Sequence, residues 1–366
     1  MFSSLSRILL LLVTQSLATH IYGQDCSCSS VVVSTHVDTL IAKDPSDPFG
    51  GLQSNATDLR RLNETYDTFG VFCAPTQKTA QSTDVVQLLV HGFSYTNEYW
   101  SPATEEFQNQ SYAAYACERG LSTFAIDVLG TGQSTRPANA SDVQYASTSA
   151  VISQLARHLK STSIIPGVES FKQVIGVGHS AGSASLIYGA IVEAENSPLD
   201  ALVLTGEVTL QPGGLSIPGI VSGRDDTPLR WSSLDPNYVT VTSTDRTLFY
   251  PADTSLFSPR MVTYDGFTKD LGPTSLLAAL GFSSLSVNYT GPVAKVVGLQ
   301  DQLICVGTGR CDDIEALNAA ERVLWPKAKS FEVILTEGGH CMNLDFLAEG
   351  AFSVVVGLVK QFAGLN

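Results

Sequence analysis

Charge is scarce in this sequence, and positive charge is the scarcer kind. Charged residues make up 15 % of the 366 residues, and 21 Lys and Arg stand against 35 Asp and Glu, a formal net charge of −14. This negative balance disfavours phosphate backbones and anionic membrane surfaces as partners, so we expect no nucleic-acid ligand. Because 44 % of the residues are hydrophobic, a disordered chain is excluded and a well-packed globule is expected.

The sequence also lacks any apolar run approaching twenty residues, which a membrane-spanning helix requires. Its start has the pattern of a secretory signal peptide instead: Arg7 precedes the apolar run at 8–13, and cleavage could follow Ala18 or Gly23. We therefore expect residues 1–23 to be a signal peptide and the mature chain to be secreted, with no stable membrane span. A retained membrane anchor is the alternative.

Five Asn-x-Ser/Thr sequons without proline agree with export of a glycoprotein. They are Asn55, Asn63, Asn109, Asn139 and Asn288.

The chain contains seven cysteines, a number that cannot pair completely within one molecule. Cys305 and Cys311 flank a turn-prone loop and could form a local disulfide, and Cys73 could pair with Cys26 or Cys28. The Cys26-x-Cys28 spacing lacks the histidine partners of a zinc site, so we assign no metal and no cofactor. The remaining cysteines are Cys117 and Cys341.

Predicted strands alternate with predicted helices, which favours an α/β fold with a mostly parallel central sheet and helices on both faces. The strands are expected at 31–40, 65–73, 85–90, 121–127, 172–177, 201–205, 293–299 and 331–335, and the helices around 103–118, 144–160, after 180, and at 354–362. A polar loop is expected at 43–63. Residues 207–290, rich in Pro, Gly, Ser and aromatic residues, break the alternation and predict a cap insertion between core segments 24–206 and 291–366.

Ser180 lies in a Gly178-His179-Ser180-Ala181-Gly182 sequence between a predicted strand and a predicted helix. A serine on such a strand-turn-helix is held in strained dihedral angles, and the two glycines allow close approach of neighbouring backbone. We interpret Ser180 as a nucleophile, which needs a base and an acid.

His340 is the candidate base among six histidines, because it lies on a glycine-rich loop after the last predicted strand. His20 lies at the signal-peptide end, His158 in a predicted helix, and His91 and His179 in turns where each would pack or orient a loop.

Asp301 is the candidate acid because it follows the preceding strand and stands between Ser180 and His340 in chain order. Glu207, one strand earlier, is the rival position. For the oxyanion hole the candidates are the backbone N–H groups of Ala181 and of Phe93, which follows the predicted strand 85–90.

These motifs, in this order, resemble the α/β-hydrolase superfamily, and in particular its secreted, cap-bearing, esterase-like members from filamentous fungi. The resemblance runs from Val85 to the C-terminus and rests on His91-Gly92-Phe93, Asp127-x-x-Gly130-x-Gly132-x-Ser134, the Ser180 motif, Gly298-x-x-Asp301 and Gly339-His340. It implies an α/β-hydrolase fold with Ser180, Asp301 and His340 as the triad. Serine rather than aspartate at the nucleophile position argues against epoxide hydrolase and haloalkane dehalogenase chemistry.

We therefore expect a secreted serine hydrolase that cleaves a carboxylic ester through an acyl-enzyme intermediate. The aromatic residues of the cap favour a small-molecule apolar or aromatic ester as substrate; they are Trp231, Phe249, Tyr250, Phe257, Tyr264 and Phe267. One alternative is an enzyme of fungal secondary-metabolite biosynthesis that performs acyl transfer, lactonisation or cyclisation. A catalytically silent binding protein is the other.

Overall fold

The computed structural model describes residues 26–77, 84–209 and 217–365, so the predicted signal peptide lies outside the described residues. Its centre is an eight-stranded sheet with the order β1-β2-β4-β3-β5-β6-β10-β11. The strands are β1 (Cys26–Ala42), β2 (Leu59–Pro75), β3 (Val85–Val90), β4 (Ser122–Ile126), β5 (Gln173–His179), β6 (Ala201–Thr205), β10 (Val293–Gly298) and β11 (Phe331–Thr336).

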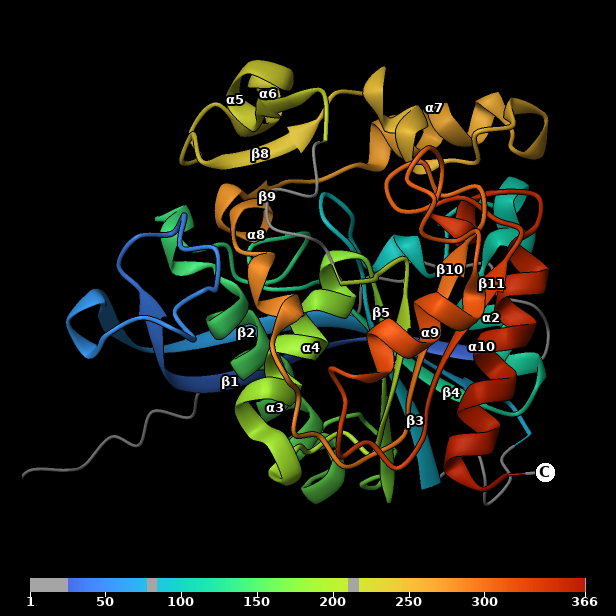
Figure 1. Cartoon of the computed structure of the whole chain (residues 1–366), viewed down its shortest axis with the longest axis horizontal. Helices are drawn as coiled ribbons and strands as arrows, with labels where there is room; N and C mark the ends of the chain where they lie inside the picture. The colour runs from blue at the N-terminus through green and yellow to red at the C-terminus, as the bar shows by residue number, and fades with distance from the viewer. Residues whose placement is uncertain (1–25, 78–83, 210–216, 366) are drawn as a thin grey trace, which may run out of the picture.

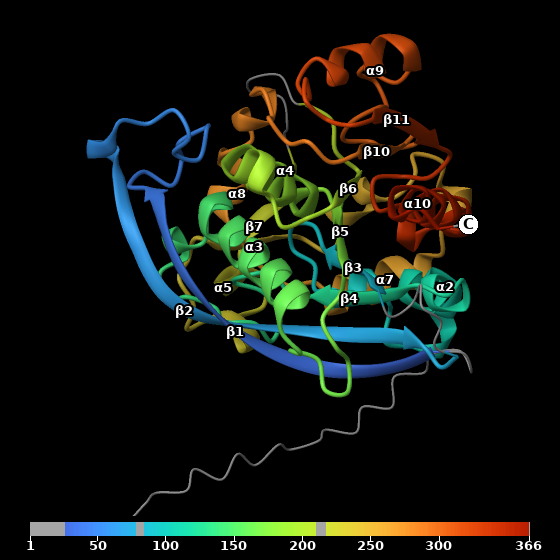
Figure 2. The same ribbon diagram turned by 90° about the horizontal axis from the view of Figure 1, so that it is seen from below.

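The six strands from β4 to β11 are parallel, which confirms the predicted mostly parallel sheet. At the other edge, β1 and β2 form an antiparallel hairpin of two 17-residue strands, and β2 also pairs antiparallel with β4. Figure 2 shows this hairpin curving along one side of the molecule.

Helices cover both faces of the sheet (Figure 2). Alternate residues of the buried strands face opposite layers: Leu88 and Val90 belong to the core cluster with α3 and α4, and Leu89 to the cluster with α2 and α10. The covering helices are α2 (Tyr112–Glu118), α3 (Tyr145–Ser161), α4 (Ala181–Glu193), α9 (Ile314–Arg322) and α10 (Ala348–Ala363). Among the described residues, no helix combines the length and the apolar character needed to cross a lipid bilayer.

The carboxyl ends of the parallel strands meet at one edge of the sheet. Val90 pairs with Gly178, and Thr205 pairs with both His179 and Val296. The residues that follow β3, β5, β6, β10 and β11 are therefore brought together although the sequence separates them widely.

Residues between β6 and β10 form a second, three-stranded sheet that lies over these carboxyl ends (Figure 1). This unit contains β7 (Ile220–Ser222), β8 (Tyr238–Val241), β9 (Gly272–Pro273), α5 (Gly223–Asp226), α6 (Pro228–Trp231), α7 (Pro259–Thr268) and α8 (Thr274–Ala278). We call the segment 207–290 the cap. Short 3-10 turns join the elements: η1 (Ala56–Asp58), η2 (Asn97–Tyr99), η3 (Glu105–Gln110), η4 (Ala140–Asp142), η5 (Ala194–Asn196), η6 (Asp245–Phe249), η7 (Thr254–Leu256), η8 (Gly281–Ser284) and η9 (Met342–Leu344).

Two predicted elements differ from the structure, and one helix of the structure was not predicted. The helix expected at 103–118 is divided into η3 and α2, because Ser111 has extended dihedral angles and caps α2 by accepting a hydrogen bond from the Ala114 N–H. The loop expected at 43–63 ends at residue 58, so the sequon at Asn63 lies in β2. Helix α9 was not predicted; only Leu317 and Glu321 are buried in it, and the helix contains few large apolar residues.

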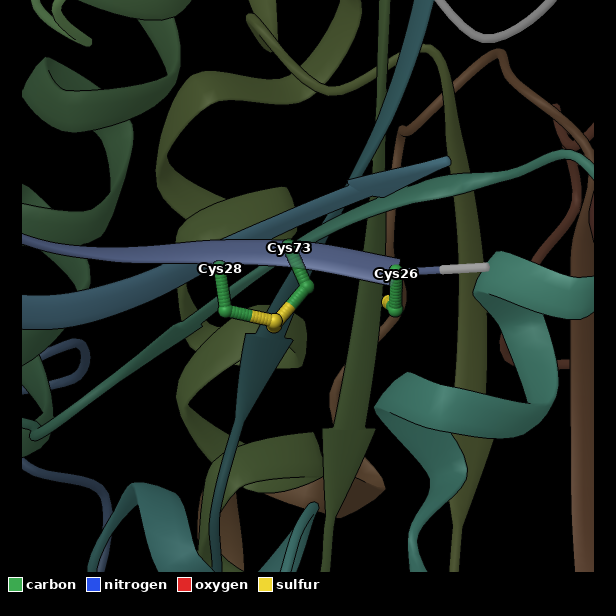
Figure 3. Close-up of side chains that lie close together, drawn as sticks. All are labelled: Cys26, Cys28 and Cys73. Atoms are coloured by element: carbon green, nitrogen blue, oxygen red, sulfur yellow. A yellow bond between two sulfur atoms is a disulfide. The ribbon is translucent and has the colours of Figure 1, made fainter. Parts of the chain in front are cut away.

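Three disulfides join six of the cysteines: Cys26–Cys117, Cys28–Cys73 and Cys305–Cys311. The local pair is as predicted, and Cys73 takes Cys28 of the two partners left open. Figure 3 shows the Cys28–Cys73 bond beside Cys26, whose sulfur lies within 4.8 Å of the other two sulfurs. A cysteine in a disulfide has no thiolate that could bind a metal ion. We therefore interpret these three cysteines as parts of two disulfides that stabilise the β1–β2 edge of the sheet.

Candidate active site

Ser180 lies between β5 and α4 with φ +51° and ψ −117°, a positive φ that non-glycine residues seldom adopt. Its N–H donates to the Thr205 carbonyl oxygen at 2.8 Å, which holds the turn against β6. A Cβ on Gly182 would lie 2.2 Å from the Val90 carbonyl oxygen, and one on Gly178 would lie 2.6 Å from the Ser183 Cα. The turn therefore requires the two glycines that the sequence motif supplies.

The structure brings Ser180, His340 and Asp301 into one continuous hydrogen-bond chain. His340 Nε2 lies 2.9 Å from Ser180 Oγ, and His340 Nδ1 lies 2.8 Å from Asp301 Oδ2. The Asp301 carboxylate can only accept a hydrogen bond, so His340 Nδ1 carries the proton and donates to it. His340 Nε2 can then accept a hydrogen bond from the serine hydroxyl. The three residues predicted from chain order are thus adjacent in space.

Backbone donors fix the carboxylate of Asp301. Its Oδ1 accepts from the N–H groups of Leu303 at 2.8 Å and Ile304 at 3.0 Å, and the residue is fully buried after β10. Oδ2 is thereby left for His340.

Asp345, which sequence reasoning missed, holds the loop that carries His340. Its Oδ2 accepts from the Gly339 N–H at 2.9 Å, and its Oδ1 accepts from the Leu347 N–H at 2.8 Å. Burial raises the pKa of Asp345 to about 6, against these two N–H bonds that lower it. The only sequence signal is an aspartate shortly after a Gly-Gly-His loop.

Phe93 and Ala181 line the same cavity as Ser180. Ala181 is the first residue of α4, so its N–H has no acceptor within the helix. A Cβ on Gly92 would lie 3.2 Å from the Cβ of Ser180, which shows how closely the turn after β3 approaches the serine. The structure therefore places both predicted oxyanion-hole residues at the cavity that contains Ser180.

The cavity at Ser180 and His340 is lined mainly by apolar side chains. They come from α4, from the cap and from the loop after Asp301: Ala184, Val208, Ile217, Leu276, Leu277, Leu280, Leu303 and Ile304. Among the described lining residues, Glu207 and His340 are the ones with a titratable side chain other than tyrosine.

The sequence profile of the alpha/beta hydrolase family matches residues 87–349, more than half of the chain. The chain belongs to the alpha/beta hydrolase family. No curated protein sequence matches it significantly.

Solved structures agree on the fold of this alpha/beta hydrolase. An esterase from Exiguobacterium antarcticum is 16 % identical with a TM-score of 0.52, over 81 % of this chain and 96 % of that one. A mutant epoxide hydrolase from Solanum tuberosum is 15 % identical with a TM-score of 0.53, over 81 % and 97 %. A peroxisomal alpha/beta-hydrolase from Saccharomyces cerevisiae is 13 % identical with a TM-score of 0.50, over 93 % and 90 %.

Two further histidines of this hydrolase orient loops at the site, as expected. The His91 Nε2 accepts from the Val128 N–H at 3.1 Å, and its Nδ1 donates to the Gly92 carbonyl oxygen at 2.8 Å. His179 stacks on Tyr99 with ring centroids 4.3 Å apart, and its ring lies 5.0 Å from that of His340. Burial, then the neighbouring His340 and His91, lowers the pKa of His179 well below its usual value. His179 is therefore neutral beside the candidate base.

Cys341 follows the candidate base and is a free, buried thiol. Its Sγ lies 3.3 Å from the Tyr95 hydroxyl and 3.4 Å from His179 Nε2. Burial raises the pKa of this thiol well above its usual value, so it stays protonated and packs behind the histidine loop.

A buried ion pair within the cap is hydrogen-bonded to the core of the hydrolase, and nothing in the sequence marked it. The guanidinium of Arg246 contacts Asp265 of α7 at 2.5 Å and donates to the Ser94 hydroxyl at 2.8 Å. The hydroxyls of Tyr95 and Tyr250 donate to the same carboxylate, each at 3.2 Å. Because Ser94 and Tyr95 follow Phe93 directly, this network fixes the turn that carries an oxyanion-hole candidate.

Proposed function

We propose that this alpha/beta hydrolase is a secreted serine esterase that cleaves carboxylic esters through an acyl-enzyme intermediate. The observation that carries the proposal is the uninterrupted chain from Ser180 Oγ through both His340 ring nitrogens to Asp301. A serine hydroxyl is a weak nucleophile until a base removes its proton, and this chain supplies both the base and the group that orients it.

In the proposed reaction His340 Nε2 takes the proton from Ser180 as Oγ bonds to the ester carbonyl carbon. The N–H groups of Phe93 and Ala181 donate to the oxyanion. When the carbon–oxygen bond to the alcohol breaks, His340 gives that proton to the leaving oxygen. Water then repeats the sequence: its oxygen bonds to the acyl carbon as His340 Nε2 takes its proton. The bond from the acyl carbon to Ser180 Oγ then breaks, His340 returns the proton to Oγ, and the carboxylic acid leaves.

Epoxide hydrolases are among the structural neighbours, but the residue at the nucleophile position favours ester chemistry here. Attack of a serine on an epoxide would form an ether, which water cannot readily cleave. Attack of a serine on an ester forms an acyl-enzyme ester, which water can cleave with the same histidine as base. The chemistry of Ser180 thus supports acyl transfer to water.

An apolar acyl or alcohol group is the proposed occupant of the cavity, because its described lining is largely aliphatic. The six cap aromatic residues named in the sequence analysis are not among the described residues that line the cavity. Trp231, Phe249, Tyr250 and Phe257 are buried in the core clusters. The expectation of an aromatic substrate therefore loses its basis, and the apolar one rests on aliphatic side chains.

Export and glycosylation remain part of the proposal. The three disulfides are compatible with an oxidising compartment. All five sequon asparagines are exposed, namely Asn55, Asn63, Asn109, Asn139 and Asn288. Expression in a eukaryotic secretory host, followed by glycosidase treatment, should lower the mass of the secreted protein; protein retained in the cell without glycan would argue against export.

The test of function is hydrolysis of para-nitrophenyl esters by the wild type, by Ser180→Ala and by a control, Ser185→Ala. Ser185 lies one turn further along α4, and its hydroxyl donates to the Ala181 carbonyl oxygen of the same helix. We expect Ser180→Ala to lower kcat by about 10⁴-fold or more, and Ser185→Ala to retain most activity. Undiminished turnover by Ser180→Ala would exclude this mechanism.

A further inference from the structure

An ionic cluster lies buried beside the proposed acyl pocket, on the same face of the sheet as α9. Lys295 in β10 is 1 % exposed, and its Nζ lies 2.7 Å from Glu207 Oε2 and 2.6 Å from Glu321 Oε2. Two carboxylates thus share one ammonium group. Ionised throughout, the cluster would carry one uncompensated negative charge away from water, which is costly.

The two carboxyl groups differ in their hydrogen bonds. Glu321 is fully engaged: it accepts from Lys295 Nζ, from the Thr209 N–H at 2.8 Å and from the Thr209 hydroxyl at 3.0 Å. Glu207 is only 7 % exposed. Its Oε2 lies in the ion pair with Lys295 Nζ, and apart from this contact no described residue is seen to hydrogen-bond the carboxyl group. Glu207 therefore has unused hydrogen-bonding capacity.

Glu207 also lines the cavity that contains Ser180 and His340. It follows Gly206 at the carboxyl end of β6, so it belongs to the same set of strand-end residues as the triad. Around it the described lining is mostly aliphatic, including Val208, Leu276 and Ile304. A buried polar group left unpaired after a fully apolar ligand has excluded water would cost binding free energy.

We propose that Glu207 is a specificity-determining residue whose carboxyl group hydrogen-bonds a hydroxyl on the otherwise apolar part of the substrate. This assignment rests on the proposed esterase function and names its substrate class: hydroxylated aliphatic esters. A hydroxyl both donates and accepts, so it satisfies either an ionised or a protonated carboxyl group. Burial raises the pKa of Glu207, with Lys295 opposing and Glu321 adding to the rise; a raised pKa favours a neutral partner over a cationic amine.

The probes are matched esters that differ by one group. On the acyl side they are para-nitrophenyl butanoate, hexanoate and octanoate, each with its ω-hydroxy and ω-ammonium counterparts. On the alcohol side they are the acetates of the corresponding alkanols, diols and amino alcohols. Two series are needed because either half of the ester could occupy the cavity, and the rate of spontaneous hydrolysis is subtracted from each measurement.

Three variants separate recognition from folding. Glu207→Leu removes the carboxyl group but leaves Lys295 paired one-to-one with Glu321, so it should fold. Glu207→Gln keeps a donor and an acceptor in a similar volume. Glu321→Gln is the matched control, since it alters the same ionic cluster at a residue that does not line the cavity.

In one of the two series we expect the wild type to prefer a hydroxylated ester over its plain counterpart by about tenfold in kcat/KM. Glu207→Leu should abolish that preference while it still hydrolyses the plain ester. Glu207→Gln should keep most of the preference, and Glu321→Gln should keep it entirely.

Three results would overturn the assignment. The preference for the hydroxylated ester could survive in Glu207→Leu, or the wild type could show no such preference at any chain length. The wild type could also prefer the ammonium ester over the hydroxylated one. Turnover of the plain esters, with Ser180 reacting with a fluorophosphonate, would show that the esterase function stands in those cases. If the wild type hydrolyses no ester and Ser180 does not react, the esterase function itself fails, and the assignment of Glu207 with it.

Discussion

Nε2 of His340 lies 2.9 Å from Oγ of Ser180, although 160 residues separate the two in the chain. Parallel strand pairing produces this contact, because β5 ends at the residue before Ser180 and β11 ends shortly before His340. The packing that places the strand ends side by side is therefore also what assembles the candidate triad. Each prediction below perturbs one part of that assembly.

Asp301→Asn should lower kcat by about 10⁴-fold without unfolding the protein. An amide at this position can donate to His340 Nδ1, and it then favours the tautomer whose Nε2 carries the proton and cannot accept from Ser180. Steady-state ester kinetics and circular dichroism check both halves of the prediction. Glu207→Gln, a change at the rival acid position, should keep most activity toward plain esters; the opposite order of effects would assign the acid to Glu207.

Gly182→Ala should abolish activity or folding, whereas Gly357→Ala should be harmless. The new Cβ at 182 would lie 2.2 Å from the Val90 carbonyl oxygen, and the one at 357 would meet nothing within 4 Å. In the middle of α10, alanine should add about 0.5–1 kcal/mol of stability. Thermal unfolding and ester turnover of both variants test this. If the two variants had the same unfolding temperature and the same ester turnover, the close approach of Gly182 to the Val90 carbonyl oxygen would be contradicted.

Asp345→Asn should change how stability depends on pH. The pKa of Asp345 is raised to about 6 from 3.8, so between these values the folded state binds more protons than the unfolded state, and stability falls as pH rises. Above pH 6 this residue alone costs roughly 3 kcal/mol relative to acid conditions. An amide removes the titration and can accept only one of the two N–H bonds.

Urea unfolding of wild type and Asp345→Asn at pH 4.5 and pH 7 gives the measurement. The wild type should gain stability relative to the variant at the lower pH, because the carboxyl group is then protonated in the folded protein. A difference between the two proteins that is the same at both pH values would place the pKa of Asp345 near its ordinary value.

Loss of the Cys26–Cys117 disulfide should cost more stability than loss of Cys305–Cys311. The first closes a chain segment with a sequence separation of 91 and the second one of 6. Loop-closure entropy then predicts losses of about 4–5 and about 2 kcal/mol for the paired serine variants. Denaturant unfolding of the two double variants compares them directly, and an equal loss would contradict the entropic explanation.

The candidate triad could be predicted from sequence because each member follows a recognisable strand. Ser180 lies in a glycine motif, and Asp301 and His340 follow the next strands in the order that the fold requires. The partner of Cys26 could not be predicted in the same way. Cys117 lies on α2, and its distance from β1 depends on how that helix packs against the hairpin.

The buried ion pairs of Lys295 and Arg246 could not be predicted either, because their partners depend on how distant elements pack. Lys295 interrupts an apolar strand, which is a visible anomaly, but its partners come from the end of β6 and from α9. Helix α9 itself was missed because most of its residues are exposed. Asp265 and Arg246 likewise pair across the cap, whose internal packing follows no simple periodicity.

The most direct test of the central claim is fluorophosphonate labelling of the purified protein, with the adduct mapped by mass spectrometry. We predict a single adduct on Ser180 that is lost in His340→Ala and kept in His158→Ala, a histidine on α3 outside the triad. A folded protein that shows no adduct, or an adduct that persists in His340→Ala, would contradict an activated serine at this site.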